Sequence, residues 1–234
     1  MMKKRLPFAF RLFMLFFAFT GTIQAQTSVR IQAGANLSKM KIVSEAGEET
    51  GTEAIPRFQI GLAVDIPMFS DFYLQPSVRY VGKGYKQDGG WLAAPDKEFK
   101  ATVNYVEVPV NFLYKSRLGF GNLLLGAGPY AGYGTGGQWQ ADQGQIIIGD
   151  IAIEPKGDAV FKSDVNNGEF GKYLYGKPWD YGVSLLAGYE FFHRLSIQFD
   201  VKLGVANLQP DLNGSASDGK LKNIGYGLSI GYCL

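Results

Sequence analysis

The residue types that carry most enzymatic chemistry are scarce in this chain. It has one histidine, His193, in the segment FFHRL, and one cysteine, Cys233, next to the last residue. Hydrolysis of a lipid or a peptide needs a nucleophile or an activated water beside a general base. Asp and Glu are also bases, but the sequence brings none into a tight constellation with a nucleophile. We predict a turn histidine, an inert buried thiol and no catalytic residue; a membrane-embedded hydrolase is the alternative.

The acid-rich segment SDVNNGEFG, Ser163 to Gly171, is the strongest candidate for a metal site. An EF-type calcium loop has its glycine five positions after the first Asp. Here Gly168 follows Asp164 by four positions, so the pattern fails. We predict a polar turn at this segment, and neither a metal nor a cofactor in the protein.

The first 25 residues have the parts of a secretory signal peptide. Lys3, Lys4 and Arg5 form a positive segment, Leu12 to Phe19 is an uninterrupted apolar run, and the small residue Ala25 ends the cleavage site. The apolar run is too short for a spanning helix. The prediction is a signal peptide at 1–25 and one mature domain at 26–234.

Removal of this leader changes the charge of the protein. Lys3, Lys4, Arg5 and Arg11 leave with it, so 19 basic residues face 21 acidic ones. The formal net charge falls from +2 to −2, which removes the main support for nucleic-acid binding. Because one cysteine cannot pair within the chain, the exported domain is not held together by disulfides.

Apolar residues alternate with polar or small residues in eight runs of about ten residues each, which is the pattern of β-strands. The chain also has 31 glycines, about twice the usual share. We predict an all-β fold, a closed antiparallel transmembrane β-barrel of eight strands with short periplasmic turns and long extracellular loops. The runs span 28–37, 57–66, 72–83, 104–115, 122–133, 179–190, 195–203 and 223–234.

Lipocalin-type soluble barrels also use eight strands, with the apolar face turned to the core. Three features favour a membrane barrel instead. The polar face is rich in charged and small residues, aromatic residues gather at the ends of the runs, and the connections alternate between long and short. The apolar face is therefore predicted to meet lipid.

The charged side chains of the polar face are expected to pair inside the narrow lumen, because an isolated charge there is costly. Lys83 and Glu190 lie on this face as well. The predicted interior polar network, with a structural role, comprises Arg30, Asp65, Arg79, Glu107, Asp180, Asp200 and Lys202.

One run, NYVEVPVNFLYK, carries a glutamate inside a strand pattern. If the connection before it closes a hairpin with Lys86 opposite Lys100, then Arg79 faces Glu107 on the neighbouring strand. Both side chains point inward by their position in the alternation. We therefore predict an ion pair between Arg79 and Glu107.

The same run contains Pro109, which this register places opposite Ser77 of the neighbouring run. Pro76 precedes Ser77, so two prolines lie at about the same level of adjacent strands. A proline cannot donate to the strand ladder, so the hydrogen bonding should be thinned at this level. The alternation slips between Tyr105 and Val106, which predicts a β-bulge.

The longest connection, 135–177, is predicted to be a long extracellular loop. It contains the β-prone segment QIIIGDIAIEP, Gln145 to Pro155, for which we expect a projecting hairpin. Two additional wall strands, giving ten, are the alternative. A ligand-binding barrel that uses the long external loops is a further functional alternative.

Four segments resemble the PorT-like outer-membrane β-barrel family common in Bacteroidetes, over essentially the whole mature chain. They are LQPSVRYVGKGYK (Leu74 to Lys86), YVEVPVNFLYK (Tyr105 to Lys115), LLLGAGPYAGYG (Leu123 to Gly134) and DYGVSLLAGYEF (Asp180 to Phe191). The resemblance implies a small outer-membrane barrel of a Gram-negative bacterium, and a family linked through its name-giving member to protein secretion. The chain departs from the pattern at its end, where Leu234 stands in place of the usual Phe.

The interior of an eight-stranded barrel is just wide enough for side chains to fill it. A general porin is therefore not expected. We expect a non-enzymatic barrel acting in envelope structure, surface contact or support of protein secretion. Its expected partners are outer-membrane lipid, the barrel-assembly machinery during biogenesis, and secretion or surface proteins.

Overall fold

The computed structural model describes residues 27–90, 93–144, 146–148 and 151–234. The predicted signal peptide lies outside the described residues. The described part of the chain contains no helix with the length and hydropathy of a membrane-spanning helix. Its main elements are the strands β1 (Ser28–Val43), β3 (Ile55–Phe69), β4 (Phe72–Gly90), β5 (Ala93–Leu118), β6 (Gly121–Ala141), β11 (Trp179–Phe191), β12 (Leu195–Gly204) and β13 (Lys220–Cys233).

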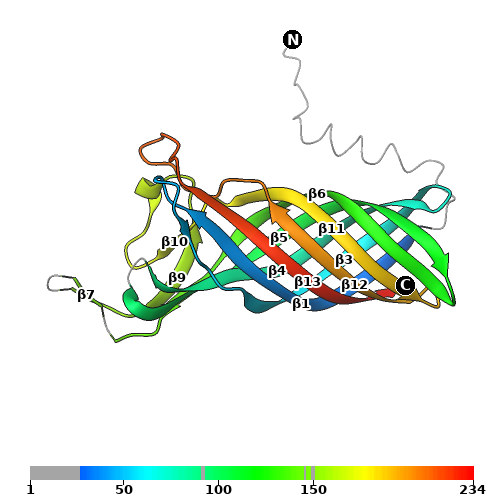
Figure 1. The fold of residues 1–234 in the computed structure, drawn as a ribbon, viewed down its shortest axis with the longest axis horizontal. Coiled ribbons are helices and arrows are strands. Elements are labelled where there is room, and N and C mark those ends of the chain that lie inside the picture. Colours follow the sequence, from blue (N-terminus) through cyan, green and yellow to red (C-terminus); the bar gives the residue numbers. More distant parts are fainter. Residues whose placement is uncertain (1–26, 91–92, 145, 149–150) are drawn as a thin grey trace, which may run out of the picture.

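These eight strands close into one ring of antiparallel pairs within the described residues (Figure 1). The order around the ring is β1-β3-β4-β5-β6-β11-β12-β13, and β13 pairs with β1 again. A closed ring leaves no wall strand with an unpaired edge, which is what a bilayer requires of a spanning sheet. The predicted eight-stranded barrel is confirmed.

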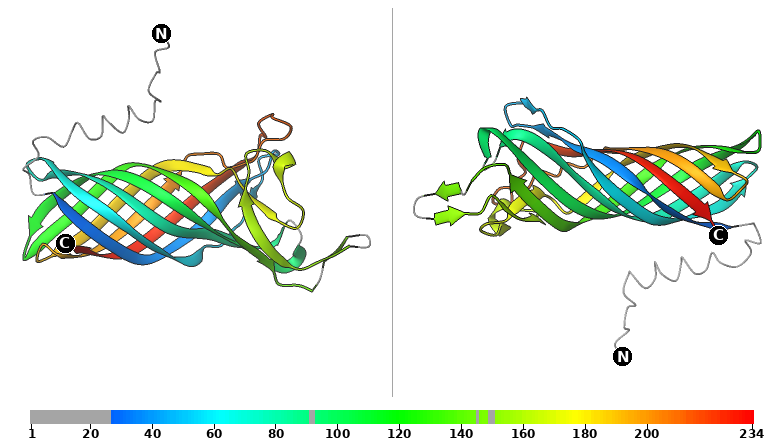
Figure 2. Two further views of the ribbon diagram at one scale, coloured as in Figure 1. Left: turned by 180° about the vertical axis from the view of Figure 1, so that it is seen from behind. Right: turned by 90° about the horizontal axis from the view of Figure 1, so that it is seen from below.

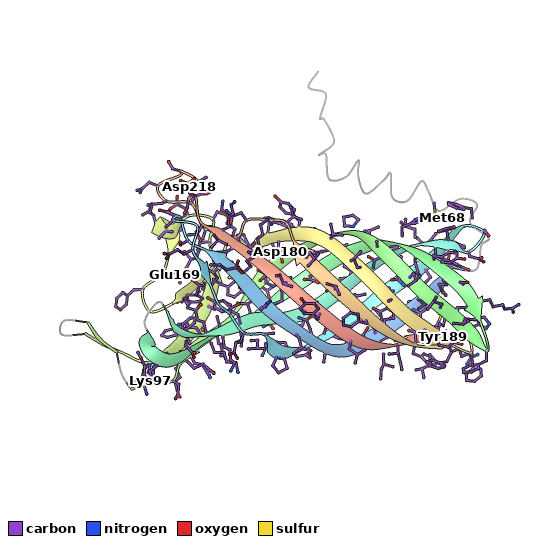
Figure 3. The ribbon with its side chains drawn as sticks, in the orientation of Figure 1. Met68, Lys97, Glu169, Asp180, Tyr189 and Asp218 are labelled. Carbon is purple, nitrogen blue, oxygen red and sulfur yellow. The ribbon has the colours of Figure 1, made fainter. Side chains whose placement is uncertain are left out.

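The two ends of the barrel differ in their connections. At one end, here called the turn side, β3–β4, β5–β6 and β11–β12 are joined by two or three residues, and the C-terminus lies at the same end (Figure 1). Tight hairpins need positive φ angles, which are adopted by Ser70 (47°), Gly119 (59°), Phe192 (49°) and His193 (59°). The opposite end, the loop side, carries the longer connections β1–β3, β6–β11 and β12–β13, together with the connection between the extended strands β4 and β5. Met68 and Tyr189 mark the turn side in Figure 3, and Lys97, Glu169 and Asp218 the loop side.

In the part of each wall strand that carries the apolar band, the apolar side chains face outward and the polar ones face inward. On β11, for example, Leu185 is 47% exposed whereas its neighbour Ser184 is 1% exposed. This confirms the predicted orientation and contradicts the lipocalin-type alternative. The resulting apolar band on the outside includes Ile31, Phe58, Ile60, Leu62, Val78, Val108, Phe112, Leu125, Val183, Leu185, Ile197, Phe199, Leu228 and Ile230.

Aromatic rings lie at both margins of the apolar band. At the loop-side margin, Tyr133 and Trp179 meet edge to face with 5.1 Å between ring centroids. At the turn-side margin, the ring centroids of Phe72 and Tyr114 lie 5.0 Å apart. Aromatic girdles of this kind mark the two membrane–water interfaces of barrel proteins, as the positions of these residues at run ends predict.

Three wall strands extend well beyond their predicted ends on the loop side. β4, β5 and β6 have 19, 26 and 21 residues, so the connection expected between Lys86 and Lys100 and the start of the loop expected at 135–177 are partly strand. β9 (Lys156–Phe161) then pairs with β6, and β10 (Tyr173–Gly176) pairs with β9. The strands continue because their inward side chains bury an apolar core beyond the membrane, described below. We call this extension the loop-side head.

The β-bulge predicted near Tyr105 exists, but the extra residue lies on the neighbouring strand. The register between β5 and β6 shifts from Asn104↔Gly136 to Tyr105↔Gly134, which leaves Thr135 unpaired on β6. The alternation of β5 runs through without a break, because β6 absorbs the shift. The bulge changes which residues of β6 face inward, so that Trp139 enters the core of the head.

The remaining small elements lie on the loop side: β2 (Glu49–Thr50), the short 3-10 helix η1 (Val165–Asn167), β7 (Ile146–Ile148) and β8 (Ile151–Ile153). β7 and β8 pair with each other in a separate two-stranded sheet, which projects away from the barrel in every view (Figures 1 and 2). The projecting hairpin was predicted correctly. Among the described residues β7 and β8 have no partner in the wall, which contradicts the ten-stranded alternative.

Leu185→Arg should destabilise the barrel in lipid vesicles by about 2–4 kcal/mol, because an arginine at the middle of the bilayer is desolvated. Denaturant unfolding of the reconstituted protein measures the effect. Val165 on the loop side is similarly exposed, at 44%, so Val165→Arg should change the stability little. Equal effects of the two substitutions would contradict the placement of the apolar band.

Candidate functional site

The lumen of the barrel contains ten charged side chains within the described residues, and their charges balance. Five are cationic and five anionic. Nine of these residues are buried, and Lys115 near the turn side is the most exposed, with 10% of its side chain accessible. The set consists of Arg30, Arg79, Lys83, Lys115, Lys202, Asp65, Glu107, Asp180, Glu190 and Asp200.

Nearest the turn side, Arg30 lies between two carboxylates. Its Nη2 donates to Asp65 Oδ2 at 2.9 Å and also to Glu190 Oε2. Lys115 Nζ contacts the same two acids, at 2.7 Å from Asp65 and 3.6 Å from Glu190. Gln75 donates to the second oxygen of Asp65 at 2.7 Å. This turn-side cluster joins β1, β3, β4, β5 and β11 across the lumen.

In the middle of the barrel, Arg79 of β4 reaches across to Asp200 of β12. Arg79 Nη1 lies 3.0 Å from Asp200 Oδ1. Beside this pair, Gln32 and Gln198 are hydrogen bonded through their amides at 3.0 Å. The middle of the lumen is thus crossed by one ion pair and one amide pair.

Toward the loop side, Lys83 lies between Glu107, at 2.7 Å, and Asp180, at 2.8 Å. Lys202 Nζ is 2.5 Å from the other oxygen of Glu107. Asn223 donates to Asp180 at 2.9 Å. These residues form the loop-side cluster, in which each lysine has at least one carboxylate partner. Asp180 is labelled within the barrel wall in Figure 3.

The predicted ion pair between Arg79 and Glu107 is wrong, although the register behind it is right. Their Cα atoms are partners, as are those of Lys86 and Lys100, and both charged side chains are buried. In a narrow barrel, however, long side chains reach across the lumen, so Arg79 meets Asp200 and Glu107 meets Lys202, both of β12. Glu107 also meets Lys83, which lies further along the neighbouring strand β4.

The predicted network also omitted three charged residues that the structure brings into the lumen. Lys83 and Glu190 had been placed on the polar face, but Lys115 had not. Its position at the same parity as Glu107 along β5 was the signal that could have identified it. Lys115 Nζ lies 4.5 Å from the ring centroid of Tyr73, which helps to hold it at the turn-side mouth.

The prolines thin the ladder where predicted. Between β4 and β5, backbone partners are found at Pro76↔Val110 and again at Arg79↔Glu107, with none between these two levels. Pro109 aligns with Ser77 in this interval, as expected. The gap lies in the charged part of the lumen, next to the level of Arg79 and Glu107.

Above the loop-side cluster the interior changes from charged to aromatic. Lys83 Nζ lies 4.6 Å from the ring centroid of Tyr105, and Tyr175 donates to Asn223 at 3.2 Å, so the two regions are continuous. The core of the head, here the loop-side core, comprises Met40, Tyr85, Phe99, Ala101, Val103, Tyr105, Trp139, Ala141, Ala159, Tyr175, Ala206 and Leu208. The alternation pattern did not indicate this core, because most of these residues fall at or beyond the ends of the predicted strands.

The single histidine lies where it was predicted, in a turn. His193 Nδ1 is 3.1 Å from the Asn122 amide nitrogen and 3.9 Å from Glu190 Oε1. It lines an open cavity of about 510 Å³ at the turn side, together with Ser28 and Cys233. Cys233 is half-buried, so the prediction of a buried thiol is wrong. In the described part of the chain, no hydrogen bond joins His193 to a hydroxyl or a thiol.

The acid-rich segment around η1 forms a capped turn. Asp164 accepts hydrogen bonds from the backbone nitrogens of Asn166, at 2.8 Å, and Gly214, at 2.7 Å. These two bonds lower the pKa of the Asp164 carboxyl. Both carboxylate oxygens of Asp164 therefore accept hydrogen bonds from the backbone. Within the residues described, no group of three or more His, Cys, Asp or Glu side chains has the arrangement of a metal site.

An apolar outside, a charged inside and a closed antiparallel ring define a transmembrane β-barrel. The chain belongs to the family described as outer membrane protein beta-barrel domain, whose model matches residues 24–209. It is thus a small outer-membrane β-barrel protein, and its outward face contacts membrane lipid.

Three solved bacterial structures are similar to this chain at low sequence identity. The attachment invasion locus protein Ail of Yersinia pestis has 11% identity and a TM-score of 0.42, with 90% of this chain and 100% of Ail covered. Neisserial surface protein A has 13% identity and a TM-score of 0.41, with 89% and 99% covered. OprG of Pseudomonas aeruginosa has 14% identity and a TM-score of 0.36, with 88% and 95% covered. No curated protein matches the chain.

Glu107→Gln should destabilise the barrel by about 3–5 kcal/mol, because it leaves two buried lysines short of a carboxylate partner. Glu98→Gln removes a carboxylate from the exposed pair with Lys86 and should have little effect. In a double-mutant cycle, Glu107 should couple strongly to Lys202 and weakly to Arg79. Strong coupling between Glu107 and Arg79 would show that these two residues form an ion pair, contrary to the structure.

Proposed function

We propose that this protein is a non-enzymatic outer-membrane barrel with a closed lumen, which presents its loop-side head for contact at the cell surface. The observation that carries the proposal is the filling of the lumen by ten charge-balanced side chains, covered by the loop-side core. Moving an ion or a solute through would break several desolvated ion pairs at once, which is costly. A general porin is therefore not proposed.

The shape of the head supports a role in contact. Strands β4, β5 and β6 continue past the apolar band, and β9 and β10 widen this sheet. Buried aromatic residues, such as Tyr85, Phe99 and Trp139, support the extension from inside. A supported sheet with a projecting hairpin is a suitable platform for a protein or surface partner.

Within its family, we propose that the chain is PorT-like, of the Bacteroidetes type, and that it supports protein secretion or surface display. The four segments quoted above support this proposal. It includes export through a cleaved signal peptide, assembly into the outer membrane of a Gram-negative cell by the barrel-assembly machinery, and an orientation with the turn side in the periplasm. Long external loops and short periplasmic turns are the general arrangement of such barrels.

The hydrolase alternative has less support from the residues. His193 is bonded to a neutral amide and lies close to a carboxylate, but a hydrolase also needs a nucleophile or water within reach of the base. We propose that His193 shapes the turn, for which its φ of 59° is needed. The ligand-binding alternative, through the external loops, is compatible with the contact role.

Vesicles that contain the purified protein should swell in a sugar solution no faster than empty vesicles, because the lumen is filled by paired side chains. A general porin reconstituted at the same density serves as the control for swelling. Swelling at a rate near that of the porin would overturn the closed-lumen proposal.

A strain that lacks the protein should secrete or display fewer surface proteins while its outer membrane keeps periplasmic enzymes inside. Surface proteomics and a periplasmic leakage assay measure the two effects. Restoration by the wild-type chain and by His193→Asn, a residue that also tolerates a positive φ, would separate the contact role from catalysis. Unchanged surface proteins with strong leakage would contradict the secretion role and leave an envelope role.

A further inference from the structure

We infer that the outer face of the loop-side head binds the phosphate groups of an outer-leaflet glycolipid such as lipopolysaccharide. The site is an open cavity of about 380 Å³ formed by β3, β5, β6 and β9. We call it the basic pocket. Its side chains on the outer face are Arg57, Lys100, Thr102, Gln138, Gln140, Lys156 and Asp158.

The basic pocket lies directly beyond the apolar band on the loop side. Along the outward positions of β5, the valines at 106 and 108 give way to Asn104, Thr102 and Lys100. Along β6, Tyr133 at the aromatic margin is followed by the outward Gln138 and Gln140. A lipid whose chains pack against the band therefore has its head group beside the pocket.

Arg57 reaches the pocket by crossing the outer face of β4 at Gly82. A Cβ added at Gly82 would lie 2.9 Å from both Cβ and Nε of Arg57, so only a glycine leaves room for the arginine at this level. Arg57 Nη2 then donates to Asn104 Oδ1 of β5 at 3.2 Å. This hydrogen bond holds the guanidinium at the level of Asn104, where the outward positions of β5 change from the valines of the apolar band to polar residues.

The three cations of the pocket lack ion-pair partners in the part of the chain that the structure describes. Arg57 is bonded to a neutral amide, and its buried Nε has no hydrogen-bond acceptor. The one carboxylate of the pocket, Asp158, lies 4.0 Å from Lys172. Several other lysines of the head are paired, as in Lys41–Glu49, Lys86–Glu53, Lys162–Glu169 and Lys177–Asp211.

Three cations against one carboxylate leave the basic pocket with a formal charge of +2, which matches the chemistry of a bisphosphorylated head group. Arginine and lysine are the residues that bind phosphate oxygens. The hydroxyl of Thr102 and the amides of Gln138 and Gln140 add neutral partners for sugar hydroxyls. A free phosphate would match the cations but would make no contact with the adjoining apolar band.

The test uses the full barrel in detergent micelles, with bisphosphorylated lipid A as the probe and native mass spectrometry as the measurement. Replacing Arg57, Lys100 and Lys156 together by Gln should weaken lipid A binding by about 10- to 100-fold, given the usual contribution of a basic residue near an anionic lipid surface. The matched control is Lys41→Gln, Lys162→Gln and Lys220→Gln, which removes the same charge from residues that do not line the basic pocket and should leave binding unchanged. Heat-modifiable migration on gels checks that both variants are folded.

If the triple variant does not fold, the half-exposed Lys100→Gln and the exposed Lys156→Gln should each weaken binding several-fold on their own. Equal affinity of the wild-type chain and the pocket variants would overturn the inference. So would binding of lipid A that has lost its phosphates as tightly as the intact lipid. Inorganic phosphate that competes fully at micromolar concentration would show an anion site without a lipid ligand, which also contradicts the proposal.

Discussion

Charge pairing inside a lumen shielded from water is the constraint on which this barrel depends. A buried charge without a partner costs several kcal/mol, and each of the ten inward charges has an opposite charge within 4.0 Å. Most of the pairs join strands that are not neighbours in the ring, such as Arg79 of β4 with Asp200 of β12 and Lys202 of β12 with Glu107 of β5. They therefore fix the strands relative to one another from the inside, while the hydrogen-bonded ladder fixes them along the wall.

The interior of the barrel changes from charged to apolar along its length, because the outer face meets lipid in one part and water in the other. Inside the membrane the wall is apolar outside, so the lumen takes the polar side chains, and these neutralise one another. Beyond the membrane the outer face meets water, so the same alternation places the apolar and aromatic residues inside. The bulge at Thr135 allows β6 to make this change, because it brings Trp139 inward. One barrel thus contains a charged plug and an aromatic cover, with Tyr105 at their boundary.

Sequence periodicity predicted the barrel and its orientation because lipid imposes a strict alternation on every spanning strand. It also placed Arg79 opposite Glu107, since register follows from counting along a hairpin. It failed to predict that the two side chains pair with other residues, Arg79 with Asp200 and Glu107 with lysines. Contacts across the lumen depend on how the barrel closes and on how far each side chain extends. The strand extensions of β4, β5 and β6 were missed for a related reason. Outside the bilayer their alternation is weaker, and pairing there depends on contacts with β9 and β10.

The arrangement is tested most directly by spin labels at neighbouring positions of β13, with Cys233 replaced by Ser, in protein reconstituted into lipid vesicles. Leu228 faces outward and Ser229 inward. A label at 228 should be relaxed by oxygen dissolved in the lipid, and a label at 229 should be shielded from oxygen and from a water-soluble nickel reagent. A label at 229 that the nickel reagent reaches freely would show an open aqueous lumen, contrary to the structure.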